Sequence, residues 1–347
     1  MPPLSSPARR RFSRAGATAL AVACLALPAR AAEPAPWTLA SGYPAALFHT
    51  VNLRQFADDV NARTRGALVV ELRPDNSAAK LSEIAAKVRS GEIAAGEVLL
   101  SALSGDAKIA GADTLPFIVN SYEDALRFWN AQRPVLQEAL DRQGLVVLYA
   151  VPWPAQGLFT VRPIHSVTDL RGAKMRTYNP STERLAQLVG ATPVEVPTQG
   201  IPQALADRRV DAMFTSPATG VDGRVWESPV KYFYNVRGWY PKNLVIANKA
   251  KWMALPEATR RSVQAAAEEA QKRGWAASDA ASSASMAELA RNGIRVETPE
   301  PELRREMRRL GENLAVEYLR ATGSEGNRVL IPYFAGDNGT PATAKSP

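Results

Sequence analysis

The feature that most constrains the fold is a strand–helix alternation that runs along the chain twice. From residue 37 to residue 151, apolar segments of strand length alternate with helical patterns, and the last of them, 145–151, is a near-continuous apolar run. Two prolines and a glycine interrupt the pattern at 152–157, and the alternation then begins again. Repeated strand–helix order predicts largely parallel sheets with helices on both faces. The sequence therefore predicts an α/β protein with two lobes.

A second constraint is an alanine-rich helical stretch that begins at Pro256 and continues without interruption to about Arg291. At 1.5 Å per residue, roughly 36 residues extend ~54 Å, which is more than one small lobe needs. We therefore expect this helix to lean against both lobes. The expected organisation is lobe 1 at 37–153 plus about 242–280, lobe 2 at 154–241 plus about 281–325, a last helix at 301–323 and a loose tail at 336–347.

The N-terminal residues 1–31 have the three parts of an export signal. They contain five arginines and no acid, an apolar run at 17–27, and an Ala-Arg-Ala cleavage pattern at 29–31. The stretch Arg9-Arg10-Arg11-Phe12 also fits the core of a twin-arginine signal. An apolar run of about eleven residues is too short to cross a bilayer, which needs ~20. We expect a signal peptide cleaved near Ala31 and a product exported to the periplasm.

Charge and cysteine content narrow the class of partner. The formal net charge of +8 suggests a nucleic-acid partner, but five of these charges lie in the predicted signal, and the rest of the chain mixes acids and bases. The single cysteine, Cys24, also lies in the signal. The exported protein is therefore expected to have no disulfide, no cysteine nucleophile and no cysteine metal site, and to bind no nucleic acid.

Catalytic motifs are weak in this sequence. The two histidines, His49 and His165, occur in unrelated contexts, and no metal-ligand, P-loop or dinucleotide pattern is present. We expect neither a metal nor a cofactor. Two S-x-x-K matches, Ser77–Lys80 and Ser228–Lys231, lack the companion motifs of serine enzymes. A secreted serine hydrolase is thus only an alternative, and no enzymatic activity is expected.

The best candidate for a binding residue is Arg176, the last charged residue of a strand predicted at 173–177. A helix is expected to begin near Pro180, with free N–H groups directed toward the same space. Ligands of α/β folds bind at the carboxyl ends of parallel strands, and a guanidinium can hold a carboxylate through two hydrogen bonds. A solvated surface arginine explains the same spacing equally well.

The segment 167–213 carries a resemblance to a known family. Its Leu-Arg-Gly-Ala-Lys-Met-Arg stretch fits L-x-G-x-K-x-R, and a helix, a loop, a short helix and a V-D-G-like strand follow in order. In this the chain resembles the DctP-type substrate-binding proteins of tripartite ATP-independent periplasmic (TRAP) transporters over about residues 37–325. Further counterparts lie at 66–74, 115–125, 242–270 and 292–296.

The resemblance implies a two-lobed, type II-like periplasmic-binding fold of the TRAP subclass, with the long helix bracing both lobes. It implies that the lobes close over an organic acid and deliver it to the integral-membrane TRAP subunits, with the binding protein acting as a monomer. The family's carboxylate-clamping arginine falls on Arg176. A receptor that presents the ligand to a sensor kinase is an alternative within the same fold.

Departures from the family pattern narrow the expected ligand. Gln156 stands where some branches carry a second arginine, and Ser216 stands where an asparagine is frequent. The loss of one cation favours a monocarboxylate, with Gln156, Thr215 and Ser216 hydrogen-bonding the remainder. Ser101, at the end of a strand of lobe 1, is a candidate for the opposing wall together with Leu100. The aromatic residues that either line the pocket or pack the hinge are Tyr43, Trp153, Trp239 and Tyr240.

Overall fold

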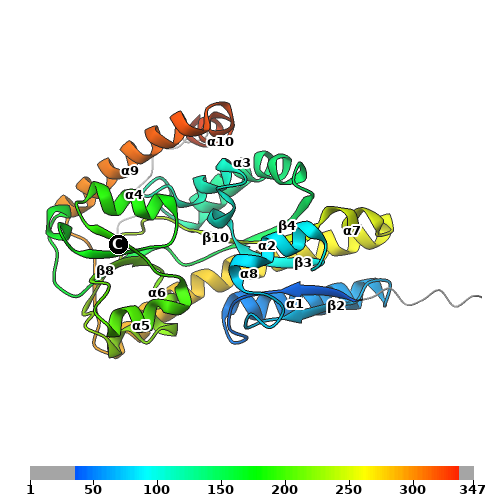
Figure 1. Ribbon diagram of the computed structural model, residues 1–347, viewed down its shortest axis with the longest axis horizontal. Helices are drawn as coiled ribbons and strands as arrows, with labels where there is room; N and C mark the ends of the chain where they lie inside the picture. The colour runs from blue at the N-terminus through cyan, green and yellow to red at the C-terminus, as the bar shows by residue number, and fades with distance from the viewer. Residues whose placement is uncertain (1–35, 336–347) are drawn as a thin grey trace, which may run out of the picture. The chain divides into compact units, whose positions relative to one another are not determined.

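Two β-sheets, each covered by helices, make up the computed structural model of the protein, which describes residues 36–335 (Figure 1). The expected export signal at 1–31 and the expected tail at 336–347 lie outside these residues. In the described range, no helix combines the length and apolarity needed to cross a membrane.

Lobe 1 is built on a five-stranded sheet in the order β2-β1-β3-β10-β4. The strands are β1 (Trp37–Ala40), β2 (Val70–Arg73), β3 (Ala95–Leu99), β4 (Leu145–Pro152) and β10 (Lys242–Asn248). The helices that accompany this sheet are α1 (Phe48–Thr64), α2 (Leu81–Ser90), α3 (Tyr122–Asp141), α7 (Lys249–Ala254) and the 3-10 turns η1 (Leu100–Leu103) and η2 (Lys108–Thr114).

Lobe 2 is built on a six-stranded sheet in the order β11-β9-β5-β8-β6-β7. The strands are β5 (Gly157–Thr160), β6 (Lys174–Thr177), β7 (Thr192–Glu195), β8 (Ala212–Thr215), β9 (Tyr232–Tyr234) and β11 (Arg295–Glu297). The helices are α4 (Pro180–Leu188), α5 (Ile201–Ala206), α6 (Pro217–Asp222) and the 3-10 turns η3 (Val167–Leu170), η4 (Thr198–Gly200) and η5 (Val225–Glu227).

The sheets are parallel except for one strand in each, which agrees with the expectation of largely parallel sheets. β10 runs antiparallel to β3 and β4, and β5 runs antiparallel to β8 and β9. Each follows directly on a strand of the other lobe, since β5 comes after β4 and β10 comes after β9. The chain leaves each lobe at the carboxyl end of a strand, so the entering strand begins at that same edge and must run the opposite way.

The two strand-to-strand crossings between the lobes, β4 to β5 and β9 to β10, are hydrogen-bonded to each other. Trp153 N–H donates to the carbonyl of Pro241 at 2.7 Å, and Gln156 N–H donates to the carbonyl of Trp239 at 2.8 Å. Gly238 N–H donates back to the carbonyl of Gln156 at 2.8 Å. The segments 153–156 and 235–241 thus form one paired connection between the sheets.

The long helix α8 (Glu257–Arg291) packs against both lobes, as expected from its length (Figure 1). Ala266 and Ala270 belong to the apolar core of lobe 1, whereas Leu289 belongs to a core of lobe 2. Close approach to β4 requires a glycine, because a Cβ at Gly274 would lie 2.3 Å from a methyl carbon of Val151. The helix is therefore shared by both lobes along most of its length.

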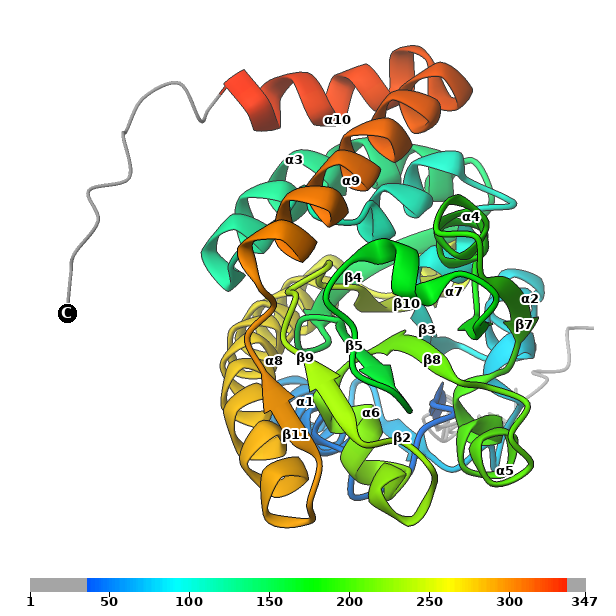
Figure 2. The ribbon, with the colours of Figure 1, turned by 90° about the vertical axis from the view of Figure 1, so that its left-hand side faces the viewer.

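Two further helices follow: α9 (Pro301–Thr322), which contacts both lobes, and α10 (Ser324–Ala335), which packs on lobe 1 and on α9. Figure 2 shows α9 beside α4 of lobe 2 and α10 beside α3 of lobe 1. Val329, Leu330 and Tyr333 of α10 are buried in the lobe 1 core. The helical pattern at 301–323 predicts α9, whereas α10 has no sequence-based prediction.

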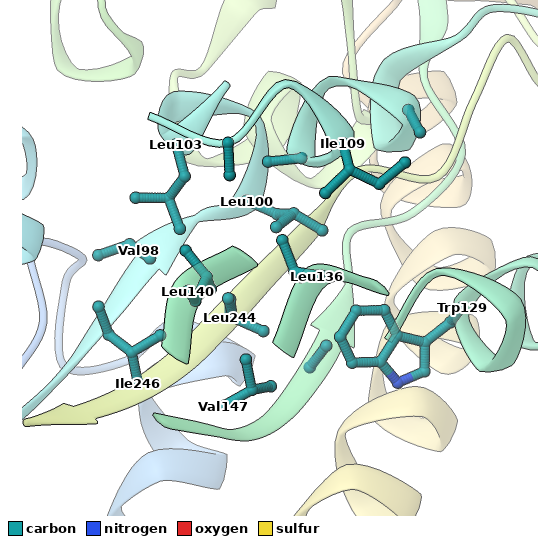
Figure 3. Close-up of a cluster of buried hydrophobic side chains, with 14 of the residues drawn as sticks. Val98, Leu100, Leu103, Ile109, Trp129, Leu136, Leu140, Val147, Leu244 and Ile246 are labelled. Atoms are coloured by element: carbon teal, nitrogen blue, oxygen red, sulfur yellow. The ribbon is translucent and has the colours of Figure 1, made fainter. Parts of the chain in front are cut away.

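The core of lobe 1 lies between its sheet and helices α2 and α3 (Figure 3). Val98, Leu244 and Ile246 of the central strands pack near Leu136 and Leu140 of α3, and all five are almost fully buried. Alternate residues of the same strands pack on α1 and α8 at the opposite face. Both faces of the sheet are thus covered, and its carboxyl-end edge is left to form a site.

Candidate functional site

A small cavity of about 30 Å³ lies where the strand ends of the two lobes meet. This is room for about one water molecule, well below the 300 Å³ or more of ordinary ligand pockets. An organic acid can therefore enter only if the lobes move apart. The residues that line the cavity are Tyr43, Leu99, Trp153, Gln156, Arg176, Tyr178, Thr198, Thr215, Thr219 and Pro241.

Strand ends explain why these residues meet. Leu99 ends β3, Trp153 follows β4, and Arg176 and Thr215 lie at the ends of β6 and β8. Gln156 immediately precedes β5, one of the two strands that begin at this edge. Residues far apart in sequence are thus brought together by the topology alone.

Arg176 is the dominant charge of the cavity. Its side chain is 3% exposed, Nε donates to the carbonyl of Val196 at 2.8 Å, and Nη2 lies 3.5 Å from Thr198 Oγ1. The guanidinium carbon lies 4.7 Å from the ring centre of Tyr178. No carboxylate in residues 36–335 pairs with it, and burial lowers the pKa of Arg176 to about 10. A buried cation without an acidic partner is energetically costly, and an anionic ligand would remove this cost.

Helix α4 starts close to Arg176, but its first turn is partly capped by the protein itself. Asn179 Oδ1 accepts a hydrogen bond from Thr182 N–H at 2.8 Å. This N–H is therefore not directed freely toward a ligand, contrary to the expectation from sequence, because the asparagine is itself an N-cap residue. Asn179 Nδ2 donates to Ser101 Oγ at 3.2 Å, which joins the two lobes.

The polar wall of the cavity combines expected and unexpected residues. Gln156 and Thr215 line the cavity, and Gln156 Nε2 donates to the carbonyl of Pro154 at 3.1 Å. Ser216 lies outside the lining, where its Oγ accepts from the N–H of Thr219 at 3.0 Å and caps α6. Thr219, a residue without a sequence-based prediction, lines the cavity instead.

The four candidate aromatics divide into two pairs. Tyr43 and Trp153 line the cavity with their ring centres 5.4 Å apart. Trp239 is outside it, and its indole N–H donates to Tyr178 Oη at 3.2 Å. Tyr240 packs on the ring of Tyr122 at 5.0 Å in the hinge region. Trp239 and Tyr240 thus pack against other residues and do not line the cavity, which is one of the two alternatives that the sequence left open.

Ser101 and Leu100 do not line the cavity. Leu100 is fully buried in the core of lobe 1, and the neighbouring Leu99 faces the cavity in its place. β3 ends at Leu99, and Leu100 is the first residue of the 3-10 turn η1, which turns its side chain into the core. Ser101 lies in an adjacent hollow that it shares with Tyr178 and Asn179.

The serines of the hydrolase alternative have other roles. Ser77 Oγ donates to the carbonyl of Pro74 at 2.5 Å, and Ser228 Oγ donates to the carbonyl of Val225 at 2.6 Å. Both hydroxyls are thus occupied by turns of their own backbone. This geometry does not support a serine nucleophile.

Comparison with known proteins agrees with this description. The family described as bacterial extracellular solute-binding protein, family 7 (DctP) matches residues 45–321. A solute-binding protein of Albidiferax ferrireducens is 26% identical over 226 residues, which is 63% of this chain and 66% of that relative. The alignment thus spans slightly less than two thirds of that protein's length.

Two solved structures are similar over a larger share of the chain. The Bordetella pertussis extracytoplasmic solute receptor DctP7, which binds pyroglutamic acid, is 38% identical with a TM-score of 0.83, covering 86% of this chain and 99% of its own. A marine-metagenome TRAP solute-binding protein specific for pyroglutamate is 33% identical with a TM-score of 0.83, covering 86% and 98%. The chain therefore belongs to the DctP family of extracytoplasmic solute-binding proteins and has the two-lobed α/β fold of TRAP solute receptors.

Proposed function

We propose that the protein captures a small cyclic monocarboxylate of the pyroglutamate type between its lobes and delivers it to the membrane subunits of a TRAP transporter. The observation that carries the proposal is the buried guanidinium of Arg176, which has no acidic partner among residues 36–335. In this proposal Arg176 holds the carboxylate through two hydrogen bonds.

The rest of the cavity fits a ligand with one charge and an apolar body. Arg176 is the only cationic residue in the lining, and Gln156 stands where a second arginine would admit a second carboxylate. Leu99, Tyr43 and Trp153 supply apolar surface for a ring. Two solved relatives that are 33% and 38% identical are a pyroglutamate-specific protein and a pyroglutamate-binding receptor.

Binding in this cavity favours closure of the lobes. Tyr43, Leu99 and Trp153 come from lobe 1, and Arg176, Thr198 and Thr215 come from lobe 2. A ligand that contacts both groups stabilises the closed arrangement over the open one. The protein is proposed to act as a periplasmic monomer after removal of its export signal, without catalysis.

Isothermal titration calorimetry of the protein purified from the periplasm tests the proposal. L-pyroglutamate should bind tightly, whereas glutarate, which has a second carboxylate, should bind at least ~100-fold more weakly, because one charge would remain buried and unpaired. Equal affinity for both acids, or no affinity for any monocarboxylate, would refute it.

A further inference from the structure

A buried chain of hydrogen bonds lies behind the two aromatic residues that line the cavity. Asn243 Oδ1 accepts from Trp153 Nε1 at 2.9 Å and from Tyr43 Oη at 3.3 Å. Asn243 Nδ2 donates to Glu97 Oε1 at 2.8 Å, and Ser41 Oγ donates to Glu97 Oε2 at 2.6 Å. All five side chains are buried, and Glu97 is only 2% exposed. The chain thus connects the cavity wall to a carboxylate inside lobe 1.

The direction of every hydrogen bond in this chain follows from chemistry. An indole N–H can only donate, so the amide oxygen of Asn243 must face Trp153. The amide nitrogen must then face Glu97, whose carboxylate oxygen accepts from it. Because the same amide oxygen faces Tyr43, the tyrosine hydroxyl must be the donor in that contact.

This direction determines what Tyr43 offers to a ligand. A hydroxyl has one hydrogen, and Tyr43 gives it to Asn243. Burial and the nearby charge of Glu97 raise the pKa of Tyr43 far above its usual value, so the phenol keeps its proton. The lone pairs of its oxygen remain, and they can only accept. Tyr43 and Arg176 line the same small cavity, so a ligand bound there meets both residues.

We infer that Glu97 and Asn243 act as positioning residues, because they hold the Tyr43 hydroxyl so that toward a ligand it can only accept a hydrogen bond. The site therefore selects a carboxylate with an adjacent N–H or O–H donor. The inference rests on the proposed function, because it places the ligand carboxylate at Arg176. A ring nitrogen next to the carboxylate-bearing carbon supplies such a donor. An analogue of the same shape with a ring oxygen at that position would bind more weakly, because its ring oxygen and the Tyr43 oxygen are both acceptors and cannot form a hydrogen bond with each other.

The location of Glu97 fits this role better than a purely structural one. A carboxylate buried close to an anion site opposes the binding of an anion, and its own burial raises the pKa of Glu97 to about 7. An apolar residue would fill the same space without that cost, but it would leave Asn243 Nδ2 without an acceptor. The carboxylate is thus explained by its need to accept from Asn243.

A matched pair of ligands tests the inference: L-pyroglutamate and the corresponding lactone, (S)-5-oxotetrahydrofuran-2-carboxylate, titrated into the purified protein. The wild type should bind the lactam at least ~10-fold more tightly than the lactone, because a hydrogen-bond mismatch replaces a hydrogen bond. In Tyr43→Phe the ratio should fall to within about threefold, mainly through weaker lactam binding. A wild type that does not distinguish the two acids, or a Tyr43→Phe variant that keeps the full ratio, would overturn the inference.

Two variants of Glu97 separate positioning from folding. Glu97→Gln retains an oxygen that accepts from Asn243 and should keep the lactam-to-lactone ratio, whereas Glu97→Leu should reduce it. Equal losses for both acids in Glu97→Leu would indicate a structural role and overturn the inference. If neither acid binds the wild type but another carboxylate does, the proposed ligand class is wrong. The inference is then tested by comparing the affinity of that carboxylate with the affinity of its analogue that lacks the adjacent donor, and equal affinities would overturn it.

Discussion

Replacement of Arg176 by methionine should abolish ligand binding without unfolding the protein. Methionine fills most of the volume of the arginine stem but carries no charge and no donor. Removing one partner of a buried, hydrogen-bonded charge pair costs about 3–5 kcal/mol. At 1.4 kcal/mol for each factor of ten, the Kd for L-pyroglutamate should rise by roughly two to three and a half orders of magnitude.

The same substitution should have little effect on the stability of the protein without ligand. Burial lowers the pKa of Arg176 from its usual 12.5 to about 10, and such a shift corresponds to about 3 kcal/mol lost by keeping the charge inside. Arg176→Met recovers this free energy but leaves the carbonyl of Val196 without its donor, at a cost of about 1–3 kcal/mol. The two effects nearly cancel.

Calorimetric titration and urea unfolding of the same preparations provide the assay. Arg171→Met, which replaces an exposed arginine of the same lobe, is the matched control and should bind as the wild type does. An Arg176→Met protein that folds normally and binds L-pyroglutamate within about tenfold of the wild type would refute the role given to Arg176.

Three further predictions concern charge, packing and specificity. Because burial raises the pKa of Glu97 from 4.5 to about 7, its contribution to stability is present below pH 4.5 and is lost as pH rises through 7. In urea unfolding, the stability of Glu97→Gln relative to the wild type should therefore increase by about 2–3 kcal/mol from pH 5 to pH 8, and a constant difference would contradict this. Gly274→Ala should cost about 2–3 kcal/mol in unfolding free energy, because its Cβ would lie 2.3 Å from Val151, whereas Gly105→Ala, with no atom within 4 Å, should be nearly neutral. Gln156→Arg should raise the affinity for glutarate relative to L-pyroglutamate by at least ~10-fold in equilibrium dialysis, and an unchanged ratio would argue against the single-cation account.

Much of the fold follows from patterns that the sequence carries locally. The strand–helix alternation, the interruption at 152–157 and the uninterrupted helical pattern after Pro256 predict two α/β lobes and a shared helix. The directions of β5 and β10 depend on where the chain crosses between lobes, and a local pattern contains no information about that. Helix α10 is stabilised by its contacts with α3, which its own sequence does not indicate.

The position of a cavity residue was predictable where a strand end alone determines it. Arg176 is of this kind, whereas Gln156 and Thr215 follow from the resemblance to the family pattern, and all three line the cavity. Side-chain direction could not be predicted in the same way, as the exchange of Leu100 for Leu99 illustrates.

Glu97 is a second case in which local sequence was insufficient. A carboxylate within an apolar strand is a visible signal for a buried polar contact. Its partner Asn243 is 146 residues away in the chain, and only the pairing of β3 with β10 brings the two together. The sequence alone therefore indicates an unusual residue without indicating its function.

A crystal structure of the protein with L-pyroglutamate shows whether Arg176 holds the carboxylate. We expect both carboxylate oxygens within about 3 Å of the Arg176 guanidinium, with the ring against Tyr43 and Trp153. A ligand held elsewhere, for example in the hollow between Phe117 and Arg304, with Arg176 making no contact to it, would refute the role given to Arg176.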